Sequence, residues 1–239
     1  MSLSSTPSSL RAWHLPSQCA VCHGWGNARV CEACTLRFAE RVPRCERCAL
    51  RVHAPVTLCG QCLRSPPIFD SALTGVDYDH PWDRLIARFK FNAALDLAAS
   101  LANLLVRAHI DSGRAQPALL LPVPLSDQRL RERGYNQAWE VARRVARTLH
   151  CAADTHLLLR VKDTPHQLSL PRARRAANVR GAFAVEPRRA PELRGRSVTL
   201  IDDVMTTAAT AAEISTVLKQ AGAAEVHLWV VARTPSPGD

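Results

Sequence analysis

Apolar residues after about position 80 follow two alternating patterns, short continuous runs and helical stripes. The continuous runs predict buried strands: ALLLPVPL, HLLLRV, SVTLID and EVHLWVVA. The stripes predict helices: Leu85, Ile86, Phe89; Leu97, Leu101, Leu104, Leu105, Ala108; Trp139, Ala142, Val145, Leu149; Ile214, Val217, Leu218, Ala221. The segment DSALTGVDYDHP, ahead of the first stripe, predicts a short hairpin. Strands that alternate with helices predict βαβ units and a mostly parallel sheet.

The amino-terminal quarter has a different pattern, because cysteines dominate it. Eight of the nine cysteines form four C-x-x-C pairs: Cys19/Cys22, Cys31/Cys34, Cys45/Cys48 and Cys59/Cys62. The chain begins without the basic start and apolar run of a secretion signal, so we expect a cytoplasmic protein with reduced thiols. A redox C-x-x-C normally occurs once, whereas two pairs supply the four thiolates of a tetrahedral zinc site. We predict two structural zinc ions, and the alternative is reduced cysteines packed as small apolar residues.

The spacing leaves the pairing of these cysteines open. We favour sequential pairing, first with second and third with fourth, and a cross-braced arrangement has the same composition. The segment 19–62 is too short to be stable on its own apolar burial, so the metal would hold it together. Four thiolates leave no open coordination position, which predicts no zinc catalysis, and His23 and His53 are interpreted as bystanders.

Composition sets the limits of the remaining interpretation. Two prolines in SPPIFD (65–70) suggest a division into a flexible N-terminus (1–18), a double zinc ribbon (19–64) and a larger domain (68–235). A hydrophobic content of 47% excludes a disordered chain, and no stretch approaches the ~20 apolar residues of a membrane span. The net charge of +10 favours a polyanionic partner, either nucleic acid or a small phosphate ligand. An aromatic content of 5% argues against a surface built mainly to stack single-stranded bases.

The strongest chemical motif is VTLIDDVMTTAAT, residues 198–210. An apolar strand ends in Asp202 and Asp203, and a hydroxyl-rich turn then leads into a helix. Ligands of α/β sheets collect at carboxyl strand ends, and a helix N-terminus offers N–H groups to phosphate. We therefore predict a sugar-phosphate site in which the two acids bind ribose hydroxyls. The turn would hold the phosphate through Thr206, Thr207, Ala208, Ala209 and Thr210. The alternative is an ordinary turn in which the acids cap the helix.

With three further blocks, this motif makes the chain similar to the ComF family, also called GntX-like, of the type I phosphoribosyltransferase superfamily. The blocks are RLIARFKF (84–91), LPVPLSDQRLRERGYNQA (121–138) and TPHQLSLPRARRAANVRGAF (164–183). The resemblance implies an α/β fold, a type I phosphoribosyltransferase-like parallel sheet flanked by helices, with a small hood and a mobile loop. It also implies binding of phosphoribosyl diphosphate (PRPP) with Mg²⁺. If the protein is an enzyme, the implied reaction is pentosyl transfer, with Asp202 and Asp203 fixing the ribose and its metal, and no residue identifies the acceptor.

The segment RLRERGYNQ is the family's signature block. Its arginines follow a strand end, where guanidinium groups could hold a diphosphate, and a solvated helix face is the alternative interpretation. The substrate-binding residues expected from this block are Arg129, Arg131, Arg133, Gly134, Asn136 and Gln137. Lys90 is a hood residue by resemblance and otherwise an exposed helical lysine. The chain departs from the family at Ala208, where Gly is usual, so we expect weakened rather than abolished PRPP binding.

A dense basic segment leaves two functions in competition. Residues 160–196 contain 10 basic and 3 acidic side chains, a local charge of +7. Within it, one cluster could close on PRPP, bind nucleic-acid phosphates or be solvated: Arg172, Arg174, Arg175 and Arg180. The first hypothesis is a PRPP-binding phosphoribosyltransferase-type protein that, by resemblance, is linked to DNA uptake and competence. The second is a non-catalytic module of the same fold that binds single-stranded DNA or a DNA-uptake partner.

Overall fold

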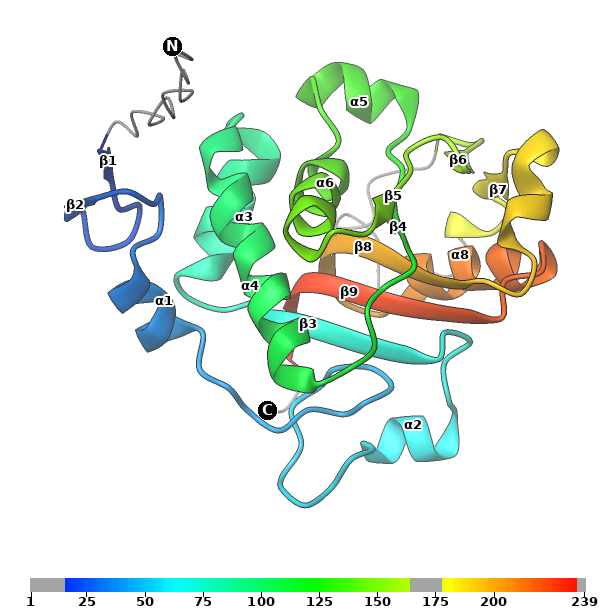
Figure 1. The fold of residues 1–239 in the computed structure, drawn as a ribbon, viewed down its shortest axis with the longest axis horizontal. Coiled ribbons are helices and arrows are strands. Elements are labelled where there is room, and N and C mark those ends of the chain that lie inside the picture. Colours follow the sequence, from blue (N-terminus) through cyan, green and yellow to red (C-terminus); the bar gives the residue numbers. More distant parts are fainter. Residues whose placement is uncertain (1–15, 164–177, 236–239) are drawn as a thin grey trace, which may run out of the picture.

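The computed structural model describes residues 16–163 and 178–235, and its centre is a five-stranded parallel sheet (Figure 1). The strands run in the order β3-β9-β8-β4-β5. Their bounds are β3 (Ser71–Asp77), β4 (Leu119–Pro122), β5 (Ala152–Ala153), β8 (Ser197–Met205) and β9 (Glu225–Arg233). The predicted α/β class with a parallel sheet flanked by helices is confirmed.

Helices cover both faces of the sheet, and this explains why its strands read as continuous apolar runs. The α-helices of this domain are α3 (Trp82–Phe91), α4 (Ala98–Ser112), α5 (Asp127–Arg133), α6 (Gln137–Leu149) and α8 (Ala209–Gln220). The 3₁₀ segments are η1 (Leu95–Leu97) and η4 (Pro187–Leu193). Leu120 and Ile201 belong to the core formed with α3, α4 and α6, whereas their neighbours Leu121 and Leu200 belong to the core formed with α8. Alternate strand residues therefore serve opposite layers.

The predicted hairpin is wrong, and one predicted strand lies outside the main sheet. The segment expected to form a hairpin is the single strand β3, which pairs in parallel with β9 from Ser71 opposite His227 onward. Gly75 within this strand is a close-packing position, because a Cβ there would lie 2.8 Å from Leu104 Cβ. The run HLLLRV forms β6 (Leu158–Arg160), which pairs antiparallel with β7 (Phe183–Val185) outside the main sheet.

The cysteine-rich segment contains little regular structure. Its elements are β1 (Ser17–Gln18), β2 (Trp25–Gly26), α1 (Glu32–Phe38) and α2 (Gly60–Arg64). Figure 1 shows its first half beside α3 and its second half, which ends in α2, next to β3. Trp82 Nε1 donates to Phe38 O at 2.6 Å, and Ala72 N donates to Glu46 O at 3.0 Å. Both halves are therefore docked on the larger domain. Within the described ranges, no helix has the length and apolarity needed to cross a membrane.

Candidate functional site

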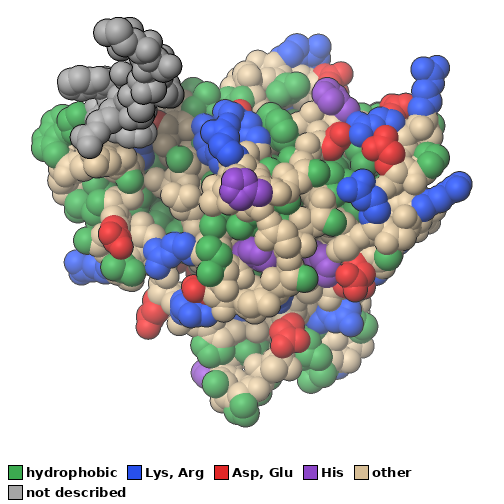
Figure 2. Space-filling view, viewed as in Figure 1, with side chains coloured by type: hydrophobic (Ala, Val, Ile, Leu, Met, Phe, Trp, Pro, Cys, Tyr) green, Lys and Arg blue, Asp and Glu red, His purple; other side chains and the backbone are tan. Residues whose placement is uncertain are grey.

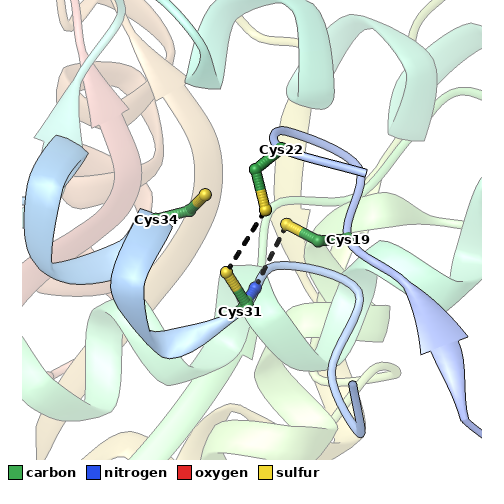
Figure 3. Close-up of side chains that lie close together, drawn as sticks. All are labelled: Cys19, Cys22, Cys31 and Cys34. Atoms are coloured by element: carbon green, nitrogen blue, oxygen red, sulfur yellow. Dashed lines mark hydrogen bonds between the residues drawn. The ribbon is translucent and has the colours of Figure 1, made fainter. Parts of the chain in front are cut away.

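The eight paired cysteines form two separate groups of four. All Sγ atoms of a group lie within 4.8 Å of one another: Cys19, Cys22, Cys31 and Cys34 in the first, Cys45, Cys48, Cys59 and Cys62 in the second. Figure 3 shows the first group, with side chains converging from the loop before α1 and from α1 itself. The predicted sequential pairing is confirmed, and the cross-braced alternative is wrong. Neither group includes His23 or His53.

The surroundings of the sulfur atoms fit a zinc site. The backbone N–H of Cys31 donates to Cys19 Sγ at 3.4 Å, and that of Cys59 donates to Cys45 Sγ at 3.3 Å. Burial opposes ionisation of Cys19, but backbone N–H donors led by that of Cys31 lower its thiol pKa to about 6. Cys34 shows the opposite balance, because burial raises its pKa to about 12. A bound cation would stabilise all four thiolates, so the two groups could each hold one zinc ion.

A cavity of about 180 Å³ lies at the carboxyl ends of the central strands. Loops after parallel strands meet at this edge, which is where ligands of α/β sheets bind. The predicted site residues that line it are Asp202, Asp203, Thr206, Thr207, Ala208, Ala209, Thr210, Arg129, Arg133 and Gln137. Tyr78, Lys90, Phe91 and Arg160 also contribute. The structure thus brings together the acid motif, helix α3 and the arginine block.

Three residues expected from the signature block do not line the cavity. Arg131 is exposed on α5, and Gly134 ends that helix in the left-handed conformation with a φ of +77°. Asn136 caps α6: its Oδ1 accepts from the N–H groups of Ala138 at 2.9 Å and Trp139 at 3.3 Å. Gly134 and Asn136 therefore shape the turn between α5 and α6 that presents Arg133 and Gln137.

The two acids lie among the last residues of β8 rather than after its end, since that strand runs on to Met205. Asp203 is 4% exposed and forms an ion pair with Lys90 at 2.8 Å. Asp202 Oδ1 accepts from the N–H of Asp203 at 2.8 Å. Burial, followed by repulsion from Asp203, raises the pKa of Asp202 to about 7 despite the attraction of Lys90. Lys90 is thus the ion-pair partner that α3 contributes, and only 16% of its side chain is exposed.

Several polar atoms of the cavity walls are buried without a partner. Among the described residues, they are Arg133 Nη1, Gln137 Oε1 and Asp203 Oδ2. The Arg133 guanidinium also lies 5.0 Å from the centre of the Phe91 ring. Buried polar groups in folded proteins are nearly always hydrogen-bonded, so partners for these atoms must come from water or a ligand. The cavity is therefore suited to a polar molecule with both acceptor and donor groups.

Arginines give one side of the cavity a concentrated positive charge. Burial, followed by repulsion from Arg129, lowers the pKa of Arg160 to about 10. Burial and the neighbouring Arg133 lower the pKa of Arg129 as well. An anion would relieve both repulsions. Arg160 was missed as a site residue, although its place at the end of an apolar run was a usable signal.

The turn after β8 leads directly into α8. Its N-cap is Ala208, at a φ of +59°, and no side chain caps the helix. The alternative in which Asp202 and Asp203 cap α8 is therefore wrong, because both carboxylates belong to the preceding strand. The first N–H groups of α8 and the positive end of its dipole remain suited to a phosphate.

Some predicted contributors lie elsewhere. Arg180 is exposed, and Arg172, Arg174 and Arg175 lie outside the described residues. A larger cavity of about 790 Å³ separates residues 39–49 from β3 and α4. Two arginines of its lining are already in ion pairs, Arg41 with Asp111 at 3.3 Å and Arg44 with Asp77 at 2.7 Å. The smaller cavity, with its unpaired buried atoms, is the better candidate for a ligand site.

Comparison with known proteins gives two groups of relatives. DNA utilization protein YhgH of Salmonella typhi is 33% identical over 230 residues, 92% of this chain and 98% of that protein. Competence protein F of Haemophilus influenzae is 35% identical over 178 residues, 73% of this chain and 77% of that protein. Among solved structures, glutamine PRPP amidotransferase from B. subtilis, complexed with ADP and GMP, has 19% identity and a TM-score of 0.38. That match covers 56% of this chain and 25% of the amidotransferase. No family model matched the chain.

Proposed function

Since the chain belongs to the ComF family, with DNA utilization protein YhgH and competence protein F among its relatives, we propose that it binds PRPP and acts in DNA uptake. The ligand would occupy the cavity at the carboxyl edge of the sheet. The observation that carries this proposal is the set of buried atoms without partners, Arg133 Nη1, Gln137 Oε1 and Asp203 Oδ2. They offer donors and acceptors to a ligand that is both anionic and rich in hydroxyl groups.

Each part of the cavity suits one part of PRPP. The turn formed by Thr206 and Thr207, with the first N–H groups of α8, would bind the 5-phosphate. Asp202 and Asp203 would accept hydrogen bonds from the ribose hydroxyls. Arg129 and Arg133 would hold the diphosphate, whose charge offsets the repulsion between guanidinium groups. A related sugar phosphate with the same three groups would fit equally well.

Mg²⁺ is part of the proposal. The carboxylates of Asp202 and Asp203 offer the oxygen donors that Mg²⁺ prefers, and Asp203 Oδ2 is without a partner. When bound, the ion would neutralise the diphosphate. Lys90 now balances the charge of Asp203, so the lysine would either stay as a second cation beside the ligand or withdraw when the ligand enters.

The chemistry that this arrangement supports is displacement of diphosphate from C1 of the ribose. The arginines would stabilise the negative charge that develops on the departing diphosphate. The acids would hold the ribose while positive charge develops on the ring. The acceptor is not part of the proposal.

The names of the relatives favour a second candidate, a non-catalytic module that handles single-stranded DNA or a DNA-uptake protein. On the face drawn in Figure 2, basic side chains are interspersed with acidic ones. The cluster Arg172, Arg174, Arg175 and Arg180 is therefore the segment to test for this function. For either candidate we propose a cytoplasmic location, since a reducing compartment keeps eight thiols available to metal.

Calorimetric titration with PRPP, with and without Mg²⁺, tests the first candidate. The Asp202→Asn/Asp203→Asn double variant should lose Mg²⁺-dependent binding while it remains folded, whereas Asp127→Asn, an exposed acid on α5, should bind normally. Unchanged affinity in the folded double variant would remove the acids from the site. A diphosphate-release assay against a panel of nucleobases and amines then separates catalysis from binding.

Salt-dependent DNA binding tests the second candidate. Each phosphate contact adds about 0.7 to the slope of log affinity against log salt for single strands, so neutralising all four arginines should flatten it by roughly 2 to 3 units. If the cluster closes on PRPP instead, the same variant should weaken PRPP binding and leave the slope unchanged. A variant that alters neither affinity would show that the cluster is solvated surface.

A further inference from the structure

A buried arginine connects the second four-cysteine group to the turn that begins the phosphate site. Arg233 is the last residue of β9 and is 5% exposed. Its Nε donates to Cys48 O at 3.0 Å, and its Nη1 donates to Met205 O at 3.1 Å and Thr206 O at 2.9 Å. One guanidinium thus holds the backbone of a metal-ligand residue and the backbone of the turn at fixed distances from each other.

The position of the Cys48 carbonyl depends on the cysteine group itself. The apolar cluster of this half of the segment consists of Cys45, Cys48, Leu50 and Cys62, so three of its four buried members are the cysteine ligands. A core of this size cannot hold a fold without a further constraint. Metal binding is that constraint in small cysteine-rich modules, where its free energy is folding free energy.

The same half of the segment contacts the carboxyl edge of the sheet at a second point. Asp77 lies opposite Arg233 in the pairing of β3 with β9, and it accepts from Arg44 at 2.7 Å and from Arg51. The first cysteine group docks differently. Its neighbour Val30 donates through N–H to Ser100 Oγ on α4, away from the turn. Among the described residues, it is the second group that Arg233 links to the turn after β8.

We propose that Arg233 is a positioning residue that transmits the metal occupancy of the second four-cysteine group to the turn 205–208. With metal bound, Cys48 is held and the guanidinium anchors the turn from both sides. Without metal, Cys48 is released, and the Arg233 bonds to Met205 and Thr206 lose their fixed reference. The first N–H groups of α8 then lose the alignment that a phosphate needs. This last consequence rests on the proposed PRPP function, whereas the loosening of the turn does not.

The coupling between the metal group and the turn must act in both directions. If metal at the second group strengthens ligand binding at the turn, a ligand at the turn must strengthen metal binding by the same factor. PRPP should therefore slow the release of zinc from the second group to a chelator. Release from the first group should be unaffected, because Val30 and Ser100 connect that group to α4 instead.

Hydrogen exchange on the full-length, zinc-loaded chain tests the loosening without any ligand. Cys59→Ser should lower zinc by one per chain and make the amides of residues 205–208 exchange about tenfold faster. Cys22→Ser, its counterpart in the first group, should also lose one zinc and accelerate exchange near α1 but not in the turn. An unchanged turn in Cys59→Ser, with one zinc lost, overturns the proposal.

A second pair of variants keeps the test decisive if Cys59→Ser unfolds more widely. Arg233→Lys retains the charge but cannot reach both backbones, so it should loosen the turn with both zinc ions present. Arg114→Lys is the matched control, since Arg114 also donates to a backbone carbonyl, that of Ala72 at 3.1 Å, near the opposite end of the sheet. Normal turn exchange in Arg233→Lys overturns the proposal.

The double variant shows whether Arg233 transmits metal occupancy to the turn or only stabilises the fold. In Arg233→Lys, adding Cys59→Ser should produce no further increase in turn exchange, because the connection is already broken. Additive effects would assign Arg233 to general stability and overturn the proposal. If exchange behaves as expected but PRPP does not bind to any variant, the mechanical link stands and the proposed function is wrong.

Discussion

The cysteine-rich segment and the sheet domain reach a folded state by opposite means. The second half of the segment has a buried cluster made mainly of the cysteines that could hold its metal ion. The sheet domain has two apolar layers, one on each side of the sheet, with fully buried residues such as Leu101, Leu200 and Val230. One region therefore depends on four thiolates at a time, and the other on the summed burial of many side chains. The difference teaches that perturbations of metal and of packing should have separate main effects, apart from the turn 205–208 that Arg233 connects to the second cysteine group.

Removal of metal should have the largest effect, and unfolding should be confined to the first region, with the turn 205–208 loosened in the second. Freshly purified, reduced protein should contain close to two zinc per chain, since each group could hold one ion. Structural zinc contributes about 10 to 16 kcal/mol in small modules, so chelation should unfold residues 19–62 while amides of β9 and of β8 before Met205 stay protected. Metal analysis and hydrogen exchange measure this. One zinc or none, or simultaneous loss of the sheet, would break the contrast.

A cavity in the core should have the next largest effect and should be confined to the second region. Leu200 is fully buried in the α8 layer, so Leu200→Ala should lower the free energy of unfolding by about 2 to 5 kcal/mol. Zinc content should stay at the wild-type level. Leu130→Ala, at an exposed position, should change stability by less than about 0.5 kcal/mol. Chemical denaturation with metal analysis checks both, and loss of zinc in Leu200→Ala would contradict the separation.

The acid pair should show that the ligand edge lowers the stability of the folded protein when both carboxylates are ionised. Burial and Asp203 raise the pKa of Asp202 from its ordinary value near 4 to about 7. Between these two pH values, Asp202 is protonated in the native state and ionised in the unfolded chain. The resulting stability is present below pH 4 and is lost as pH rises towards 7. Asp202→Asn should therefore be more stable than wild type at pH 8, by roughly 1 to 3 kcal/mol, and the difference should shrink towards pH 4. Equal stabilities at both pH values would contradict this, and Asp127→Asn is the control.

The smallest effect is expected at the turn before α8. Ala208 adopts a φ of +59°, a conformation that Gly adopts without the steric cost of a Cβ. Ala208→Gly should stabilise the ligand-free protein by about 0.5 to 1 kcal/mol and strengthen PRPP binding a few-fold. Ala209→Gly, one residue later inside α8, should destabilise it by a similar amount. A loss of stability in Ala208→Gly would show that the unfolded-state entropy of glycine outweighs the relief of strain.

Predictions from the sequence were most successful where they rested on the spacing of one residue type or on a regular pattern of apolar residues. The C-x-x-C spacing predicted two cysteine groups, and the apolar runs SVTLID and EVHLWVVA predicted β8 and β9. The predictions failed where pairing depended on distant partners. The run HLLLRV reads like the other buried strands, yet β6 pairs with β7 outside the sheet. The segment DSALTGVDYDHP reads like a hairpin, yet it forms the single strand β3, and Gly75 within it leaves room for α4.

The residues of the candidate site also fall into those that local sequence patterns predict and those that only the fold brings together. By itself, the sequence determined which chemical groups are available, because C-x-x-C pairs, an acid pair at a strand end and an arginine-rich block are local patterns. Only the tertiary structure decided which of them meet. It paired Lys90 with Asp203, added Arg160 to the cavity, and placed Asn136 as a helix cap rather than in the cavity wall. It also joined Cys48 to Thr206 through Arg233, residues that lie 185 and 27 positions away from that arginine. Such contacts arise from the register of β9 beside β3 and β8, and no local pattern in the chain encodes that register.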